Sequence, residues 1–203
     1  MKRVLFVLCT LLLGVVSGKS IESASAQTQG PYKVGSYYNV NGKEGVVFEV
    51  SADGYHGKIV SMDQTNAAWD SRVVYCDTYK EFVADTGTLT GANSYSDGKS
   101  NTDKIMRRSD RQYFEAAKWC RAKGASWYLP AVDELKAIKN VSSKLNATLK
   151  YRGGTVFVSD IFDSYWSSTE YDEFCAWDVH MGNGYTYNSN KNYYGYVRAV
   201  SAF

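Results

Sequence analysis

The chain has 203 residues, with 23 Lys and Arg against 21 Asp and Glu, which gives a formal net charge of +2. This near balance gives no electrostatic support for nucleic-acid binding, which relies on clustered basic residues to neutralise phosphates. Seventeen Tyr and five Trp with only two Pro favour a sheet-rich domain with aromatic surfaces.

A short basic start and an apolar run open the chain. Met1–Arg3 precedes Val4–Val16, which is too short to span a bilayer comfortably and is typical of a secretory signal peptide. The A-x-A pattern at Ala24–Ala26 predicts the cleavage point, with Val16–Gly18 as the second candidate. An uncleaved membrane anchor is the alternative. The segment therefore predicts an exported protein that is periplasmic, on the cell surface or secreted.

These features divide the chain into a signal peptide (residues 1–26), a flexible leader (27–33) and a single domain (34–203). The domain is long enough for a substantial core. Contact with the membrane is expected only through the signal peptide. An exported domain with three cysteines can form one disulfide and leave one free thiol, and the pairing stays open. The three cysteines are Cys76, Cys120 and Cys175.

Short β-prone runs begin the domain. Val46–Val50 and Lys58–Met62 flank an Ala-Asp-Gly turn, which predicts a hairpin. Tyr37–Val40 is an earlier candidate strand. Thr86–Asp103 is rich in Gly, Thr, Ser and Asn and indicates a long loop. Within it, Asp97–Thr102 predicts a turn followed by a helix cap.

Two helical patterns follow the loop. Asp110–Lys123 has apolar residues three and four positions apart, with Asp110 as the predicted N-cap and Gly124 at the stop. An extended segment then leads into a second helix, whose apolar stripe is Val132, Leu135 and Ile138. Leu145–Leu149 is predicted to form a separate short helical turn.

The rest of the chain has a β pattern. In one alternating strand, Trp177, Val179 and Met181 share a face, and Asp178 and His180 share the other, expected to be an exposed polar face. Gly182–Gly184 predicts a turn, and Tyr185–Tyr187 begins a return strand. Asn188–Asn192 is expected to interrupt that strand, and Tyr196–Phe203 to close the fold as one strand.

Several motifs occur in a fixed order over roughly residues 95–203. They are Ala116–Cys120, Trp127–Pro130, Asp133–Leu135, Tyr165–Glu170, Ala176-Trp177 and Tyr196–Val200. Together they resemble the bacterial domain family of the Lcl adhesin C-terminal type. The resemblance implies an α+β, C-type-lectin-like fold, in which two helices pack on a twisted antiparallel sheet and the N- and C-terminal strands pair.

The resemblance also implies a class of function. Members of the family are mostly exported or phage-borne binding domains, and the Lcl domain is associated with glycosaminoglycan binding. Related variable proteins, diversified by mutagenic retroelements, end in a similar region rich in Tyr, Asn, Ser and Asp. Formylglycine-generating enzymes share the broad fold but need two active cysteines close in sequence. Cys175 has no such neighbour, and Cys175 and His180 would point to opposite faces of one strand.

Tyrosine and asparagine side chains gather near the C-terminus and form the predicted ligand-binding surface. Tyr offers large, rigid contact area at low entropic cost, and Asn adds adaptable hydrogen bonds. Alternate tyrosines that simply pack the sheet are the alternative interpretation. The predicted ligand-binding residues are Tyr185, Tyr187, Asn188, Asn190, Asn192, Tyr193, Tyr194, Asp178 and His180.

Other prominent residues have structural interpretations. Trp127, Trp166 and Trp177 are predicted to lie in the core. Arg198 is predicted to pair with a carboxylate such as Glu170 or Asp178. Asp178 and His180 alone lack the further ligands that a metal site needs.

The sequence predicts no catalytic residue, no metal and no cofactor. It predicts a secreted or surface-exposed module that binds a glycan or another cell-surface molecule. The alternatives are a structural or assembly subunit that uses the same surface as an interface, and a diversified variable protein that binds a protein ligand.

Overall fold

The computed structural model describes residues 30–73, 87–160 and 162–203. The helices are α1 (Gly98–Met106), the 3-10 helix η1 (Arg111–Tyr113), α2 (Glu115–Ala122) and α3 (Val132–Tyr151). The first strands are β1 (Tyr37–Val40), β2 (Lys43–Val50), β3 (Gly57–Val60), β4 (Thr65–Ala68) and β5 (Trp127–Tyr128). The later strands are β6 (Ser164–Glu170), β7 (Cys175–His180), β8 (Thr186–Asn190), β9 (Tyr194–Val197) and β10 (Val200–Ala202).

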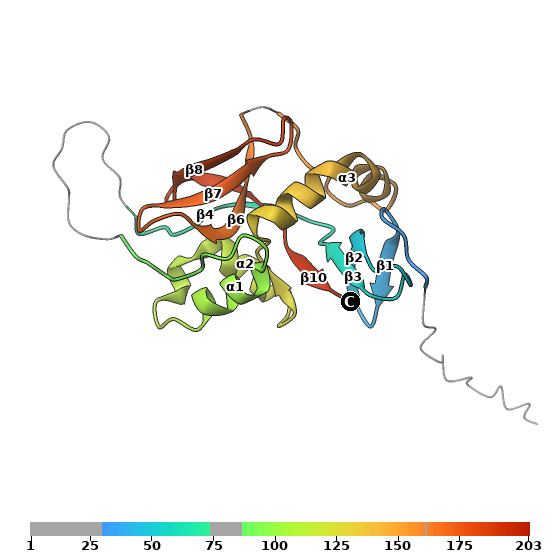
Figure 1. Cartoon of the computed structure of the whole chain (residues 1–203), viewed down its shortest axis with the longest axis horizontal. Helices are drawn as coiled ribbons and strands as arrows, with labels where there is room; N and C mark the ends of the chain where they lie inside the picture. Colours follow the sequence, from blue (N-terminus) through green and yellow to red (C-terminus); the bar gives the residue numbers. More distant parts are fainter. Residues whose placement is uncertain (1–29, 74–86, 161) are drawn as a thin grey trace, which may run out of the picture.

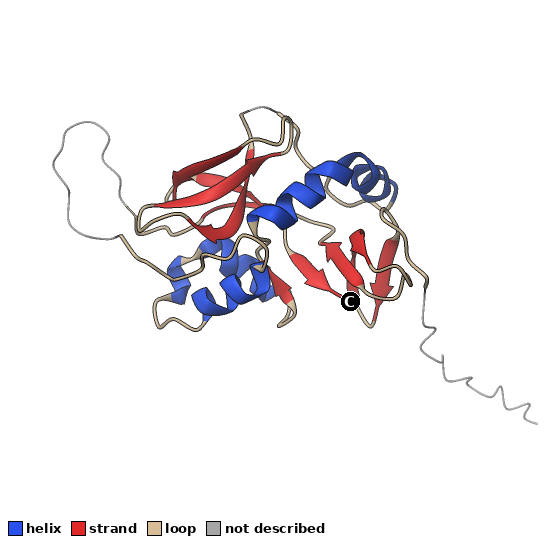
Figure 2. Cartoon of the chain, viewed as in Figure 1, coloured by secondary structure: helices blue, strands red, loops and turns tan. Residues whose placement is uncertain are grey.

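The described strands form two sheets. One has the order β1-β2-β3-β10-β5 and the other β4-β9-β6-β7-β8. Figure 1 shows the two sheets next to each other, with α3 running from one to the other and with α1 and α2 beside the second sheet. Figure 2 shows the same division, with the longest helix between the two groups of strands. The predicted α+β class is confirmed, with two sheets where one was expected.

The N- and C-terminal parts of the domain meet in the first sheet. β10 runs antiparallel to β3, with Val200 opposite Val60. Phe203 and Gly57 extend this pairing, since each donates its backbone N–H to the other's carbonyl at 3.0 and 3.2 Å. The ring of Tyr32 lies 5.2 Å from that of Phe203. Tyr32 is therefore packed on the domain, although the sequence placed it in the flexible leader.

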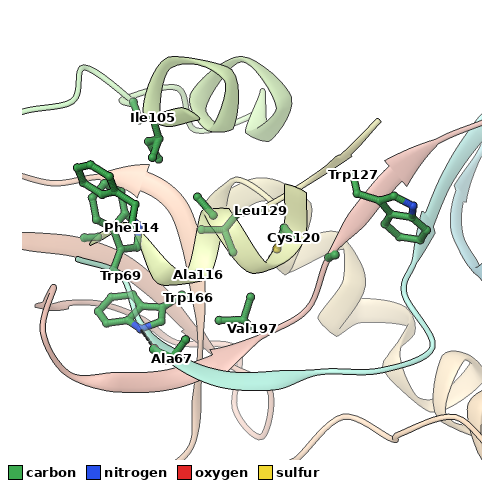
Figure 3. Close-up of a cluster of buried hydrophobic side chains, with 14 of the residues drawn as sticks. Ala67, Trp69, Ile105, Phe114, Ala116, Cys120, Trp127, Leu129, Trp166 and Val197 are labelled. Atoms are coloured by element: carbon green, nitrogen blue, oxygen red, sulfur yellow. Dashed lines mark hydrogen bonds between the residues drawn. The ribbon is translucent and has the colours of Figure 1, made fainter. Parts of the chain in front are cut away.

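Aromatic rings fill the core beneath α2 and the second sheet (Figure 3). Trp69 meets Phe114 edge to face, with ring centroids 5.6 Å apart. The Nε1 of Trp69 donates to the Ser167 carbonyl at 2.8 Å, and the Nε1 of Trp166 donates to the Ala67 carbonyl at 3.1 Å. The buried indole N–H groups of Trp69 and Trp166 are thereby both satisfied, as burial of a polar group requires.

The start of the first predicted helix needs correction. The Asp110 carboxylate is bound by Arg72 and Arg108, at 2.8 Å to each, and makes no capping bond. Only a 3-10 turn forms there, and α2 begins at Glu115. The cap predicted at Asp97 is confirmed, because its carboxylate accepts the backbone N–H of Ser100 at 2.8 Å at the start of α1.

The second predicted helix is longer than expected, since α3 continues through Leu145 to Tyr151 without a break. Its first turn is held by the buried carboxylate of Glu134. That carboxylate accepts the backbone N–H of Ala131 at 2.9 Å and that of Gly98 at 3.2 Å, and the Tyr128 hydroxyl at 2.8 Å. One side chain thus joins the starts of α1 and α3 to β5.

The predicted closing strand is two strands, which belong to different sheets. The break falls at Arg198, which is fully buried. Its guanidinium donates to three oxygens, the Ser61 carbonyl at 2.9 Å, Gln64 Oε1 at 2.6 Å and the Thr155 carbonyl at 2.8 Å. The predicted ion pair of Arg198 with Glu170 or Asp178 is wrong, because neutral oxygens from the crossover segments surround the guanidinium.

Candidate functional site

Most of the predicted surface lies on a hairpin at the open edge of the second sheet, whereas Asn192, Tyr193 and Tyr194 follow that hairpin in the chain. β8 ends the strand order there and pairs antiparallel with β7. The turn between them contains Gly184 at φ 81°, in the left-handed region that favours glycine. The predicted interruption from Asn188 onward is wrong, because β8 continues in register as far as Asn190, opposite Cys175.

Four predicted tyrosines are exposed to solvent. The exposed fractions are 63% for Tyr185, 47% for Tyr187, 58% for Tyr193 and 71% for Tyr194. Tyr185 and Tyr187 stand at the start of β8, whereas Tyr193 and Tyr194 follow the turn into β9. These four residues are called the exposed tyrosines below.

Strand alternation divides the predicted residues between two faces of the hairpin. Tyr187 is opposite Asp178, and its ring meets that of His180 with centroids 4.9 Å apart. Asn188 is opposite Trp177 and therefore points to the other face. The structure brings Tyr187, Asp178 and His180 together, but it does not gather all nine predicted residues on one face.

Asp178 and Asn190 are buried, with 1% and 6% of their surface exposed, and Asn192 is half-buried. The expected exposed polar face is therefore wrong for Asp178. The Nε2 atom of His180 lies 3.8 Å from the Oδ1 atom of Asp178. Burial raises the pKa of the Asp178 carboxyl, while the nearby Ser189 and Ser164 side chains and His180 oppose that rise.

A buried ion pair fixes the turn after β8. The ammonium group of Lys191 donates to Glu170 Oε1 at 2.7 Å and to the carbonyls of Thr88, Asp172 and Glu173 at 3.0, 2.7 and 3.2 Å. Burial lowers the pKa of Lys191, and the interaction with Glu170 acts in the opposite direction. The carboxylate of Glu170 also accepts the backbone N–H groups of residues 90 and 91.

Sequence reasoning missed this pair, since Lys191 belongs to a stretch that was predicted to be exposed. The one available signal was a single Lys among uncharged Tyr and Asn residues.

Sequence reasoning also missed two aromatic residues beside Trp177. The ring centroid of Tyr95 lies 6.1 Å from that of Trp177, and the Tyr171 ring stands edge-on at 5.1 Å. Tyr95 and Tyr171 are about half exposed, at 48% and 53%. Trp127 and Trp166 are buried as predicted, but Trp177 is only half-buried.

Two thiols are free in the described part of the chain. Cys120 is buried in the core, and Cys175 is half-buried at the start of β7. Burial is the main cause that raises the pKa of both thiols, for Cys175 with help from Asp172. Cys175 and His180 lie on opposite faces of β7 because their spacing is odd. Cys76 and the predicted signal peptide lie outside the described residues.

A separate surface hollow of about 320 Å³ lies on the α1–α2 side of the domain. It is lined by Met106, Ser109, Arg111, Gln112 and Lys118. Across residues 30–73, 87–160 and 162–203, no three His, Cys, Asp or Glu side chains are grouped to hold a metal ion. Over the same ranges, no helix has both the length and the apolar character needed to cross a membrane.

Comparison with known proteins identifies a family and a similar structure. The Lcl C-terminal domain model matches residues 58–201, which confirms the resemblance and extends it upstream. A fimbrial protein from Bacteroides ovatus ATCC 8483 has a similar fold, with a TM-score of 0.63 and 18% identity. The match covers 85% of this chain and 49% of that one, so this chain spans about half its length. No curated protein sequence matches.

The Lys191 ion pair makes a prediction about stability. Lys191→Met should lower the free energy of unfolding by about 3–5 kcal/mol, because Glu170 is left charged and buried without its partner. Urea unfolding followed by circular dichroism measures the change. The double variant with Glu170→Gln should recover part of the loss. The control is Lys136→Met, since that side chain is 46% exposed and its change should stay within about 1 kcal/mol. Equal losses for Lys191→Met and Lys136→Met would contradict the assignment.

The raised pKa of Asp178 predicts a pH-dependent effect. Above the folded-state pKa the carboxylate is charged and buried, which costs stability; below the ordinary value of 3.8 this cost disappears. Asp178→Asn should therefore raise the Tm by a few degrees at pH 7, and the gain should shrink as the pH falls towards 4. Differential scanning calorimetry gives the Tm, with the exposed Asp133→Asn as control. A gain that grows on acidification would refute this account.

Proposed function

The chain belongs to the Lcl C-terminal domain family, and from this premise we propose that it is an exported binding module without enzymatic activity. Its ligand is a glycan or another cell-surface molecule, recognised by the C-terminal hairpin region. The observation that carries this proposal is the set of four exposed tyrosines, Tyr185, Tyr187, Tyr193 and Tyr194, on a framework fixed from beneath.

The exposed tyrosines suit recognition for a physical reason. A tyrosine ring gives a large contact area and loses little conformational freedom on binding. The chain just before Tyr193 is held by the buried Lys191, and the carbonyl of Tyr193 accepts the Trp166 indole N–H at 3.3 Å. A ligand therefore meets side chains whose backbone is already ordered, which lowers the cost of binding.

Other features support the absence of catalysis and the exported location. A raised thiol pKa keeps Cys175 protonated, and His180 faces away from it, so this pair does not suit nucleophilic attack. The apolar run Val4–Val16 supports export. The similar Bacteroides ovatus structure is that of a fimbrial protein, which is compatible with a location on the cell surface.

A glycan array tests the proposal directly. The chain from Gln27 onward should bind at least one immobilised glycan, and Tyr193→Ala combined with Tyr194→Ala should weaken that binding by about tenfold or more. Tyr151→Ala is the control, because Tyr151 is 83% exposed at the end of α3 and should not matter. The proposed function would be refuted if the chain bound no glycan on the array and if the double variant bound whole cells as well as the unaltered chain does.

Assembly is the second candidate function, and the position of β8 favours it. β8 ends its sheet, so one side of its backbone has no strand partner within the described ranges. The fimbrial neighbour is compatible with a subunit role. Light scattering after size-exclusion chromatography separates the candidates, because binding requires exposed tyrosines. A stable oligomer that dissociates on Tyr185→Ala with Tyr187→Ala would favour assembly, whereas a monomer would favour binding.

A further inference from the structure

Three aromatic side chains form a corner on the face of β7 opposite to Asp178. Trp177 comes from β7, Tyr171 from the β6–β7 connection and Tyr95 from the segment before α1. The rings of Tyr171 and Trp177 are nearly perpendicular, at 85°, and Tyr95 is tilted at 54° to the indole. These three residues are called the aromatic corner. None of the predicted binding residues belongs to it.

The backbone beneath both tyrosines is held in place. The Tyr95 carbonyl accepts the backbone N–H of Asp133, in the first turn of α3, at 2.9 Å. The backbone N–H of Tyr171 donates to the Cys175 carbonyl at 3.0 Å, and Tyr171 directly follows the ion-paired Glu170. The backbone that carries both tyrosines is therefore rigid. Their rings are about half exposed and do not belong to the buried core.

The size of the corner favours a small ligand over a protein. Two half-exposed tyrosines and a half-buried tryptophan present far less than the roughly 800 Å² per partner that a stable protein interface buries. One ring-sized group fits this area better. Asn188 is exposed and lies opposite Trp177 on the same face, so an amide that can donate and accept hydrogen bonds stands beside the rings.

A pyranose ring matches this combination. One of its faces carries C–H groups that pack on aromatic rings, and its hydroxyls can bond to an amide such as that of Asn188. The corner is therefore amphipathic in the same sense as a sugar.

Charge narrows the class of sugar. Asp97 and Glu173 are two residues from Tyr95 and Tyr171, and Asp133 is bonded to Tyr95 through its backbone. All three are exposed carboxylates. The ammonium group of Lys136 lies 4.0 Å from Asp133 Oδ1 and offsets the charge of that carboxylate alone. Sulfated and carboxylated sugars would be repelled here. The cations that line the α1–α2 hollow, Arg111 and Lys118, lie on other elements.

We propose that the aromatic corner, with Asn188, binds a neutral, unsulfated pyranose unit of a glycan. The proposal rests on the proposed glycan-binding function and deepens it by naming the site and the class of sugar. The corner would hold one sugar ring of that glycan.

The test compares matched variants of the chain from Gln27 onward on an array of neutral and sulfated glycans, followed by titration calorimetry with the best neutral glycan. Tyr95→Ala and Tyr171→Ala should each weaken binding by about tenfold with the Tm unchanged, and Tyr171→Phe should retain it. In a ¹H–¹⁵N spectrum the neutral glycan should shift the indole signal of Trp177. The control variant Arg111→Ala with Lys118→Ala should bind normally.

The outcomes separate this inference from the function on which it rests. If Tyr193→Ala with Tyr194→Ala abolishes glycan binding while Tyr95→Ala and Tyr171→Ala do not, the corner is refuted and the glycan-binding function stands. If only sulfated glycans bind, and Arg111→Ala with Lys118→Ala removes that binding, the corner is refuted in favour of the basic hollow. If the unaltered chain binds no glycan on the array, both the corner and the glycan-binding function fall.

Discussion

The ion pair between Lys191 and Glu170 is the constraint on which the C-terminal region depends. A lysine with no exposed surface is costly unless its charge is paired and its N–H groups are bonded, and here one carboxylate and three carbonyls surround it. Those partners come from residue 88 and from residues 170, 172 and 173, so two separate segments must converge on the turn of Lys191 for the charge to be buried. The convergence sets the path of the turn that carries Tyr193.

The pleat of the sheet has the next largest effect on the site. Adjacent residues of β8 point to opposite faces, so Tyr187 joins Asp178 while Asn188 joins Trp177. A region that reads as one Tyr/Asn-rich surface therefore becomes two surfaces with different chemistry. One combines a tyrosine with a histidine and a buried carboxylate, and the other combines an amide with three aromatic rings.

Local chemistry was sufficient to predict much of the fold. Apolar periodicity and turn residues identified the hairpin, the two main helices and the cap at Asp97, because these depend on neighbours in the sequence. The charged side chains were harder to place. Asp110, Arg198 and Lys191 each bond to a residue more than 20 positions away, namely Arg72, Ser61 and Glu170, and a local sequence pattern does not predict such pairs. The division of strands between two sheets depends on the same distant contacts.

The sequence predicts that aromatic rings are exposed, but it does not predict which of these rings lie together. A sequence rich in Tyr indicates aromatic surface, yet Tyr95 and Tyr171 reach Trp177 only because α3 and the Glu170 ion pair anchor their backbones. This anchoring has an energetic consequence. Because the backbone is ordered before a ligand arrives, a small ligand does not have to supply the ordering free energy. A rigid aromatic corner can therefore retain a single sugar ring, whereas the same residues on a mobile loop would need a larger partner.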